Sequence, residues 1–257
     1  MTAIHRPARR AQTRPARPGQ PPPERQKDAK DADERTLREE RILDAAAALL
    51  VRWGYRKTTI DDVAREAGVG KGTIYLHWKD KSDLFRATIW RASRQASEET
   101  SQRMAADPEG GLFHRMWAHG MLAVLSNPLL AALMKGNSDI FQGLLSTMDQ
   151  ETLDLIRGDA EKHLAQLQHV GLIRADLSIP VMTLLMGALK IGLIYISDIP
   201  TQEQMPTKEQ LTDALSDLIR RWLEPERLPS DSAEGKQIMG EWLESINDIT
   251  EQLQQPQ

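Results

Sequence analysis

The stretch Thr58–Phe85, TTIDDVAREAGVGKGTIYLHWKDKSDLF, carries two closely spaced helix signals. Thr59 followed three residues later by Asp62 is the pattern of a capping box, in which each side chain bonds the backbone N–H of the other residue. Gly68 is expected to end this helix, because glycine adopts a left-handed backbone without strain. A second short helix over about 71–77 follows the turn. The stretch therefore predicts a helix-turn-helix unit.

The residue types within this unit suit both its packing and a contact with DNA. Small or β-branched residues allow two short helices to cross closely, and they occur at Val63, Ala64, Ala67, Val69 and Ile74. The second helix carries hydrogen-bond donors at Lys71, Thr73, Tyr75 and His77. Gly72 removes bulk where a backbone would approach a phosphate. A major groove about 12 Å wide accepts one such helix.

The segments on either side of this unit are also predicted to be helical. Upstream, apolar residues recur every three or four positions, the pattern of an amphipathic helix, at Ile42, Ala45, Ala46, Leu49, Leu50 and Trp53. Gly54 then provides a left-handed stop. Downstream, Asp80 with Asp83 three residues later begins a longer helix toward about Ala105.

Beyond Pro108 the periodicity predicts helices only, and no strand-like alternation is sustained. The expected helices cover about 111–126, 128–135, 147–170, 178–197, 207–223 and 233–253. The sequence thus predicts an all-α fold. The last helix, after Pro229, has no function that the sequence assigns.

Charge is distributed unevenly along the chain. Residues 1–27 hold seven basic residues and one acid, and residues 35–94 hold thirteen basic and eight acidic residues. Residues 96–257 hold twelve basic and twenty-four acidic residues. A nucleic-acid partner is therefore expected for the first third only. Residues 1–33 are proline-rich and predict a disordered basic arm, either a solvated tail or a segment that adds phosphate or minor-groove contacts.

The composition excludes several classes of protein. The chain has no cysteine, which excludes disulfides, thiol catalysis and cysteine-based metal sites and is compatible with a reducing cytoplasm. The first thirty residues lack the apolar core of a secretory signal. The apolar segment 179–196 contains Lys190, so a helix buried in protein is expected rather than a membrane span.

No catalytic or metal-binding pattern is visible. His114 and His119 lie five residues apart, which does not align them on one helix face, and His163 and His169 are expected at the surface of a long helix. The glycine loops, metalloprotease motif and nucleophile elbow of common enzymes are missing. No catalytic residue, metal or cofactor is therefore predicted.

The ordered details of the first third resemble the DNA-binding domain of the TetR/AcrR family of regulators. The matching features are Gly54-Tyr55, the Thr-Thr-Ile-x-x-Val-Ala-x-x-Ala-Gly-Val pattern over 58–69, Lys-Gly-Thr-Ile-Tyr-x-His-Trp over 71–78, Lys81 and the Asp-Leu-Phe of 83–85. Gly70 departs from the serine or threonine that usually caps the second helix. Leu76 and His77 depart from the usual His-Tyr or Tyr-His pair, so base preference is not transferable.

The resemblance implies a role for each matching residue. Thr59, Tyr75 and Lys81 would bind phosphates, with Gly72 allowing a close approach. Lys71, Thr73 and His77 would lie nearest the bases, and Trp78 would pack the helix against its own domain or the DNA backbone. Simpler roles stay open: Thr59 caps its helix in any case, Tyr75 and Trp78 would suit a core, and Lys81 would suit a solvated surface.

For the rest of the chain the resemblance implies an effector-binding and dimerisation domain over 83–257, after a helix-turn-helix DNA-binding domain over 34–82. Candidate effector contacts, which ordinary core packing would explain equally well, are Met116, Trp117, His119, Met121, Met134, Asp139 and Phe141. Candidate dimer contacts, on two strongly apolar helices, are Met186, Leu189, Leu193, Leu215, Ile219 and Trp222.

The expected function is a homodimeric, cytoplasmic repressor that binds a palindromic double-stranded operator, without contact with a membrane. A small, largely apolar effector would release it by tilting the helix over 80–105, which joins the two domains. A constitutive or architectural DNA-binding protein without an effector is the alternative. An enzyme that carries a helix-turn-helix is disfavoured by the missing catalytic residues.

Overall fold

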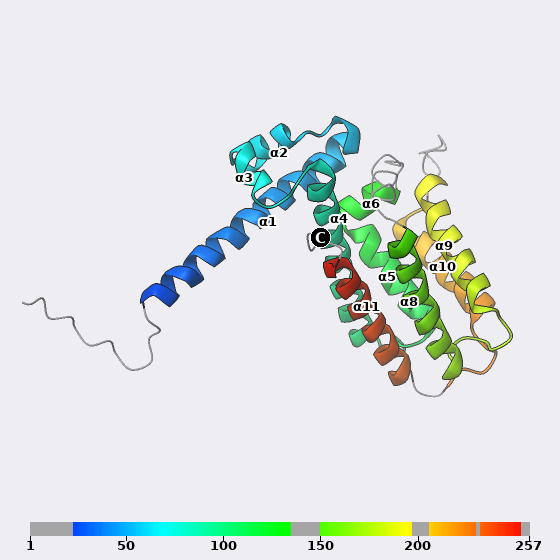
Figure 1. Cartoon of the computed structure of the whole chain (residues 1–257). Helices are drawn as coiled ribbons and strands as arrows, with labels where there is room; N and C mark the ends of the chain where they lie inside the picture. Colours follow the sequence, from blue (N-terminus) through cyan, green and yellow to red (C-terminus); the bar gives the residue numbers. More distant parts are fainter. Residues whose placement is uncertain (1–22, 135–149, 197–205, 230–231, 253–257) are drawn as a thin grey trace, which may run out of the picture. The chain divides into compact units, whose positions relative to one another are not determined.

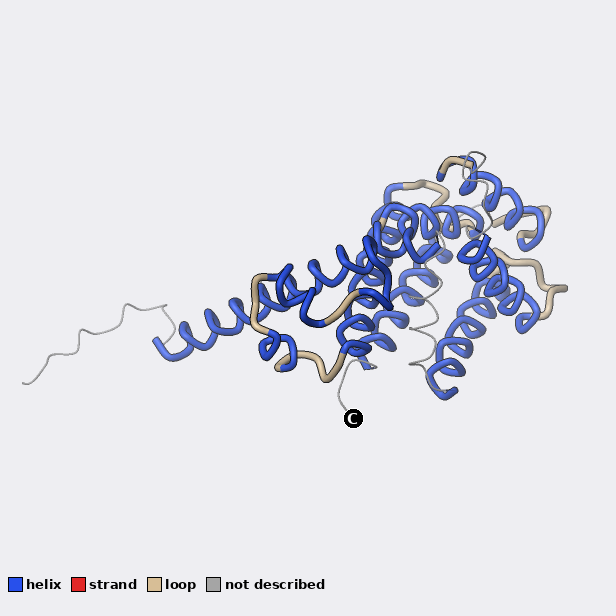
Figure 2. The backbone as a smooth tube through the Cα atoms, turned by 90° about the horizontal axis from the view of Figure 1, so that it is seen from above, coloured by secondary structure: helices blue, strands red, loops and turns tan. Residues whose placement is uncertain are grey.

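The computed structural model describes residues 23–134, 150–196, 206–229 and 232–252. All regular structure in these ranges is helical and none of it is a strand (Figure 2). The predicted all-α class is therefore confirmed. Residues 1–40 and 41–257 form two compact units, which are described separately below.

The first unit contains the beginning of helix α1 (Pro23–Lys57). Residues 23–33, which composition assigns to a disordered arm, are helical in the structure. Six of these eleven residues are Glu, Lys, Arg or Ala, which favour a helix even without a core to pack on. Proline at the first helical position is also tolerated. The remainder of the predicted arm, residues 1–22, lies outside the described residues.

Residues 41–106 contain the predicted helix-turn-helix (Figure 1). Gly54 interrupts α1 with φ 76° and ψ 175°, a conformation that only glycine adopts readily. After it come α2 (Ile60–Ala67), the short α3 (Lys71–Tyr75) and the long α4 (Lys81–Ala106). Gly68 has φ 65° and ψ 37° and ends α2 in the left-handed conformation that the sequence predicts.

The two predicted N-terminal caps are present. The Asp62 backbone N–H donates to Thr59 Oγ1 at 3.2 Å, and the Thr59 N–H donates to Asp62 Oδ2 at 3.1 Å, which completes the capping box. The Asp83 N–H donates to Asp80 Oδ1 at 2.9 Å at the start of α4. One apolar cluster holds these helices together, and its fully buried members include Ile42, Ala46, Leu50, Val63, Ile74 and Leu84.

Within the described ranges the larger domain is built from α4 and six further helices, whose bounds are close to the predicted ones. They are α5 (Phe113–Ser126), α6 (Pro128–Met134), α8 (Gln150–His169), α9 (Ile179–Ile196), α10 (Lys208–Leu223) and α11 (Ala233–Gln252). Helix α5 packs against both α4 and α10, and α11 packs against α4 and α8 (Figure 1). Among the described residues no helix has the length and apolarity needed to cross a membrane.

Helix α11, which the sequence leaves without a function, is tied to its neighbours by polar contacts. The Lys236 ammonium donates to the Asp107 carbonyl oxygen at 2.6 Å, and Arg94 of α4 pairs with Glu251 at 2.7 Å. His163 of α8 is only 1% exposed and stacks on Trp242 of α11 at 5.6 Å. The expectation that His163 lies at the surface is therefore wrong, because α11 covers that face of α8. His169 is exposed as expected.

Candidate nucleic-acid interface

Exposure divides α3 and the residues after it into two faces. Ile74 and Trp78 are buried, whereas Lys71, Gly72, Tyr75 and Leu76 are exposed. Tyr75 is 48% exposed and Leu76 is 77% exposed, so the core interpretation of Tyr75 does not hold. The outward face of α3 therefore consists of Lys71, Gly72, Tyr75 and Leu76.

Two of the three residues expected nearest the bases are only half-exposed. Thr73 lies at the edge of the outward face, and the His77 ring is tilted against Trp78, with ring centroids 5.2 Å apart. The sequence did not single out Leu76 as a contact residue. The helical repeat could have identified Leu76, because it follows Gly72 by four residues and therefore lies on the same face of the helix.

Trp78 belongs to the core of the small domain. Its side chain is 6% exposed and packs in the cluster around Ile42, Ile74 and Leu84. Its backbone N–H donates to the Ile74 carbonyl oxygen at 3.0 Å. Of the two alternatives left open by the sequence, packing against its own domain is the one that this position supports. Trp78 thus holds α3 in place without a ring surface free for DNA.

Lys71 is oriented by an acidic residue of α2. Its ammonium lies 2.9 Å from Asp61 Oδ2, and both side chains are exposed. The hydrogen bond that Lys71 donates to Asp61, together with the negative charge of Asp61, raises the pKa of Lys71. An exposed pair of this kind is weak and easily exchanged. A phosphate or a base edge would therefore compete with Asp61 for the ammonium at little cost.

The Thr59 hydroxyl already has two partners in the capping box. It donates to Asp62 Oδ2 at 2.6 Å and accepts the Asp62 N–H. The hydrogen bond from Thr59 also lowers the pKa of Asp62. The capping role is therefore present without DNA. A phosphate contact by this hydroxyl would require the bond to Asp62 to be exchanged.

Lys81 is held over aromatic rings at the start of α4. Its ammonium is 4.5 Å from the centroid of Tyr55 and 5.6 Å from that of Phe85, distances typical of cation–π contacts. The two rings meet edge to face at 5.5 Å. Burial lowers the pKa of Lys81. A partly desolvated ammonium gains more from a nearby anion than a fully hydrated one does.

The glycines of this region have different surroundings. A Cβ at Gly72 would meet no atom within 4 Å, so packing inside the chain does not require glycine there. Gly70 begins α3 without any side-chain cap, as its departure from the family pattern predicts. The absence of a side chain at Gly72 leaves the outward face open next to Leu76.

The candidate effector residues have mixed positions in the larger domain. Met116, Trp117 and Met121 are buried in its apolar cluster, where core packing accounts for them. Met134 lies at the end of α6, and its side chain lies outside the described part of the chain. Asp139 and Phe141 also lie outside the described residues. Among the described side chains, the α5 residues Met116, Trp117 and Met121 are the members of the predicted set that lie in one cluster.

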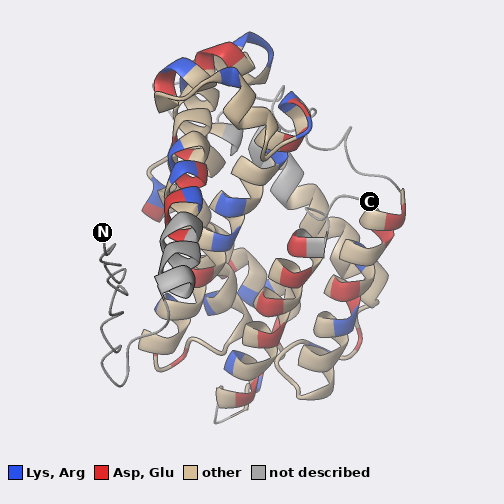
Figure 3. Ribbon diagram, turned by 60° about the vertical axis from the view of Figure 1, so that its left-hand side comes forward, with Lys and Arg blue, Asp and Glu red and all other residues tan. Residues whose placement is uncertain are grey.

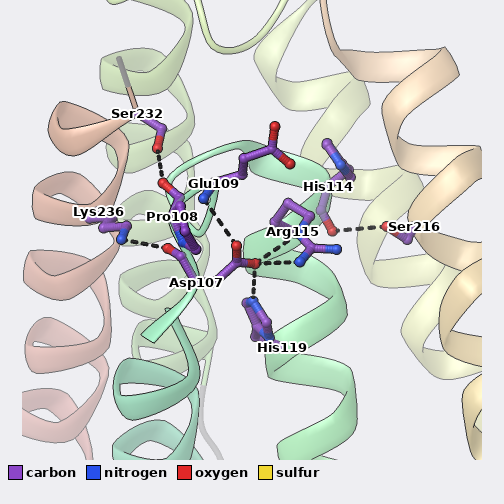
Figure 4. Close-up of polar contacts among 9 residues, drawn as sticks. All are labelled: Asp107, Pro108, Glu109, His114, Arg115, His119, Ser216, Ser232 and Lys236. Atoms are coloured by element: carbon purple, nitrogen blue, oxygen red, sulfur yellow. Dashed lines mark hydrogen bonds and ion pairs between the residues drawn. The ribbon is translucent and has the colours of Figure 1, made fainter. Parts of the chain in front are cut away.

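His119 contributes to a polar cluster at the junction of α4 and α5 (Figure 4). Its Nε2 donates to Asp107 Oδ2 at 2.8 Å, and Arg115 Nε donates to the same oxygen at 2.8 Å. The Glu109 backbone N–H donates to Asp107 Oδ1 at 3.0 Å. His119 Nδ1 is buried without a hydrogen-bond partner among the described residues. His119 thus has a structural partner in Asp107, which no spacing in the sequence indicated.

A fall in pH is expected to remove part of the stabilisation that the Asp107 carboxylate gives to the folded state. Burial raises the pKa of this carboxyl, but the hydrogen bonds from His119, the Glu109 N–H and Arg115 together hold it below the ordinary value of 3.8. A carboxyl whose pKa is lowered by folding stabilises the folded state above the unfolded-state pKa, and this contribution is lost as the pH falls through the folded-state pKa. Urea unfolding of the wild type and Asp107→Asn from about pH 6 to about pH 2 measures the effect.

The difference in the free energy of unfolding between wild type and Asp107→Asn should be constant at the upper end of this pH range. It should then shrink as the pH drops below 3.8. A difference that stays constant down to about pH 2 would contradict the assigned contacts. Asp154→Asn is a suitable control, because the Asp154 carboxylate is exposed and pairs with Arg157 one turn away on the surface of α8.

A second buried polar pair joins α5 to the end of α10. Glu224 is buried, and its Oε1 accepts hydrogen bonds from the His114 backbone N–H at 2.8 Å and from His114 Nδ1 at 2.9 Å. Ser216 Oγ donates to the His114 carbonyl oxygen at 3.4 Å. His114 and Glu224 lie 110 positions apart, so the spacing of residues in the sequence did not indicate that they pair.

Half of the predicted dimer contacts face the interior of their own chain. Met186, Leu215 and Ile219 are buried in the apolar cluster of the larger domain, where packing within the chain accounts for them. Leu189 and Trp222 pack against the same cluster and are half-exposed. Leu193 lies on α9 with its side chain outside the described part. Among the described side chains of α9 and α10, the large apolar ones that are exposed are Val181, Leu184, Leu185 and Leu218.

Comparison with known proteins agrees with this geometry. Residues 42–88 match the family described as bacterial regulatory proteins, tetR family. Over 132 residues the chain is 28% identical to the uncharacterized HTH-type transcriptional regulator YhgD of Bacillus subtilis, covering 48% of this chain and 68% of the relative. Over 153 residues it is 28% identical to the HTH-type transcriptional repressor BepR of Brucella suis, covering 60% of this chain and 65% of the relative.

The same fold occurs in a solved regulator. NalD of Pseudomonas aeruginosa, described as the secondary repressor of the MexAB-OprM multidrug efflux pump, superimposes with a TM-score of 0.54 and 19% identity. The superposition covers 75% of this chain and all of NalD. Since these relatives regulate transcription, the prediction that the chain is not an enzyme is confirmed. The chain belongs to the TetR/AcrR family and is a helix-turn-helix regulator of transcription.

Proposed function

We propose that the protein is a ligand-responsive repressor that binds operator DNA through the outward face of α3. The observation that carries this proposal is the exposure of Lys71, Tyr75 and Leu76 on a helix that buried Ile74 and Trp78 hold in place. Lys81, at the start of α4, adds a partly desolvated cation to the same domain. The repressor role is supported by the name of BepR, which is 28% identical to this chain.

The larger domain is proposed to supply dimerisation and effector binding. Leu184 is 70% exposed, and Val181, Leu185 and Leu218 add apolar surface on the same two helices. A second copy of the chain would cover this surface and present two α3 helices to a palindromic operator. Asp and Glu recur along the helices of this domain, where DNA would be repelled (Figure 3). The methionines of its core suit an adaptable site for a small apolar effector.

Binding to DNA from beside the protein's own gene tests the proposal. The logarithm of the affinity should fall linearly with the logarithm of the salt concentration, with a slope of about −0.9 for each phosphate contacted. Fluorescence anisotropy of a labelled duplex across a salt series measures this slope, and titration at high concentration gives the number of protomers per duplex. A folded protein whose binding is absent or insensitive to salt would contradict the proposal.

An effector separates a repressor of this kind from a constitutive DNA-binding protein. A small apolar compound that binds the free form should both raise the melting temperature and weaken binding to the same duplex. If no compound in a diverse apolar set changes either quantity, the constitutive alternative is favoured.

A further inference from the structure

Leu76 is exposed on the face that is proposed to meet DNA. At 77% exposure it is the most exposed large apolar side chain of the described residues. Single exposed leucines are common on protein surfaces. This one, however, shares the outward face of α3 with Lys71 and Tyr75, whose side chains are charged or polar.

The backbone places Leu76 next to Gly72, a position without a side chain. Leu76 ends α3 with φ −74° and ψ −20°, which still continues the helix. Side chains on a helix lean toward its N-terminus, over the residue four positions earlier. For Leu76 that residue is Gly72, which has no side chain and has nothing within 4 Å of its Cβ position. The leucine methyl groups therefore border an open part of the face, and a base edge would have room to approach them.

The chemistry of the side chain selects the group that it would contact. Leucine neither donates nor accepts a hydrogen bond, so it gains nothing from the polar edges of bases. The thymine C5-methyl is the apolar group that the major groove presents. We propose that Leu76 contacts a thymine methyl group and makes the protein prefer thymine at one position of each half-site. This inference rests on the proposed function, because it requires α3 to lie in the major groove.

Replacement of thymine by deoxyuridine tests the contact, because it removes only the methyl group. A duplex is first selected from a random-sequence library with the wild-type protein. Each thymine of one half-site is then replaced in turn by deoxyuridine, and the affinities of wild type and Leu76→Ala are measured. Leu155→Ala is the matched control, since Leu155 is an exposed leucine on α8, outside the DNA-binding domain.

One replacement is expected to weaken wild-type binding about fourfold, the value of one buried methyl group. The same replacement should leave Leu76→Ala unchanged, while Leu155→Ala should behave like the wild type. The inference is overturned if no replacement matters, or if each replacement weakens wild type and Leu76→Ala equally. Failure of the wild type to select any sequence, together with salt-independent binding, would instead refute the proposed function.

Discussion

Changing Gly111 to alanine is expected to lower the melting temperature of the protein by roughly 6–12 °C. A Cβ at Gly111 would overlap the Ser232 carbonyl oxygen and lie 2.9 Å from the Lys236 backbone nitrogen. These are backbone atoms, so no side-chain rotation relieves the overlap. Overpacking of this kind costs about 3 kcal/mol at the upper end of its usual range. One kcal/mol shifts the melting temperature by about 2–4 °C in a protein of this size.

Gly158→Ala is the matched control for this experiment. Gly158 lies within α8, and a Cβ there would meet no atom within 4 Å. Alanine is favoured over glycine inside a helix by about 0.5–1 kcal/mol, so this variant should melt slightly above the wild type. Differential scanning calorimetry of the three proteins measures both shifts. A Gly111→Ala protein as stable as the wild type would mean that α11 does not pack on the turn between α4 and α5 as described.

The double substitution Tyr75→Ala/Lys81→Ala is expected to weaken DNA binding by about 100-fold or more. Tyr75 is exposed on the outward face of α3, and Lys81 lies over Tyr55 with its charge partly desolvated. A hydrogen bond to a charged group contributes about 1.5–3 kcal/mol, and two such bonds to phosphates would be lost in each half-site. The salt dependence should also become shallower by about one for each lysine–phosphate contact removed.

Lys162→Ala tests whether loss of positive charge alone produces this effect. Lys162 is exposed on α8, so this variant should bind DNA like the wild type. Removing the Lys81 contact with Tyr55 also costs the fold about 0.5–1 kcal/mol, and thermal unfolding shows whether the double variant is still folded at the assay temperature. A folded double variant with unchanged affinity and salt slope would show that these two residues do not bind phosphates.

Helices and caps were predictable from sequence because the interactions that set them are local. The capping box at Thr59 and the left-handed Gly68 depend on residues within four positions of each other, and both were found where the pattern places them. The beginning of α1 was missed. The charged segment after Pro23 lacks an apolar stripe, and helix propensity alone was enough to make it helical.

The side of each helix that is buried depended on residues far away in the chain. The sequence marked α9 and α10 as apolar, but their pattern did not separate Ile219, which packs inward, from Leu218, which is exposed. His163 looked like a surface residue until α11 supplied Trp242 as its stacking partner. The environment of His119 also depends on a residue outside its own helix, because its partner Asp107 lies beyond the end of α4.

The sequence by itself determined the all-α class, the helix-turn-helix and the family, because these follow from local spacing and from an ordered motif of adjacent residues. Only the tertiary structure decided which face of α3 is outward, that Trp78 belongs to the core, and how α11 is tied to α4. Burial and long-range pairing depend on which helices meet, and a periodic pattern states that a helix has an apolar side without stating what covers it.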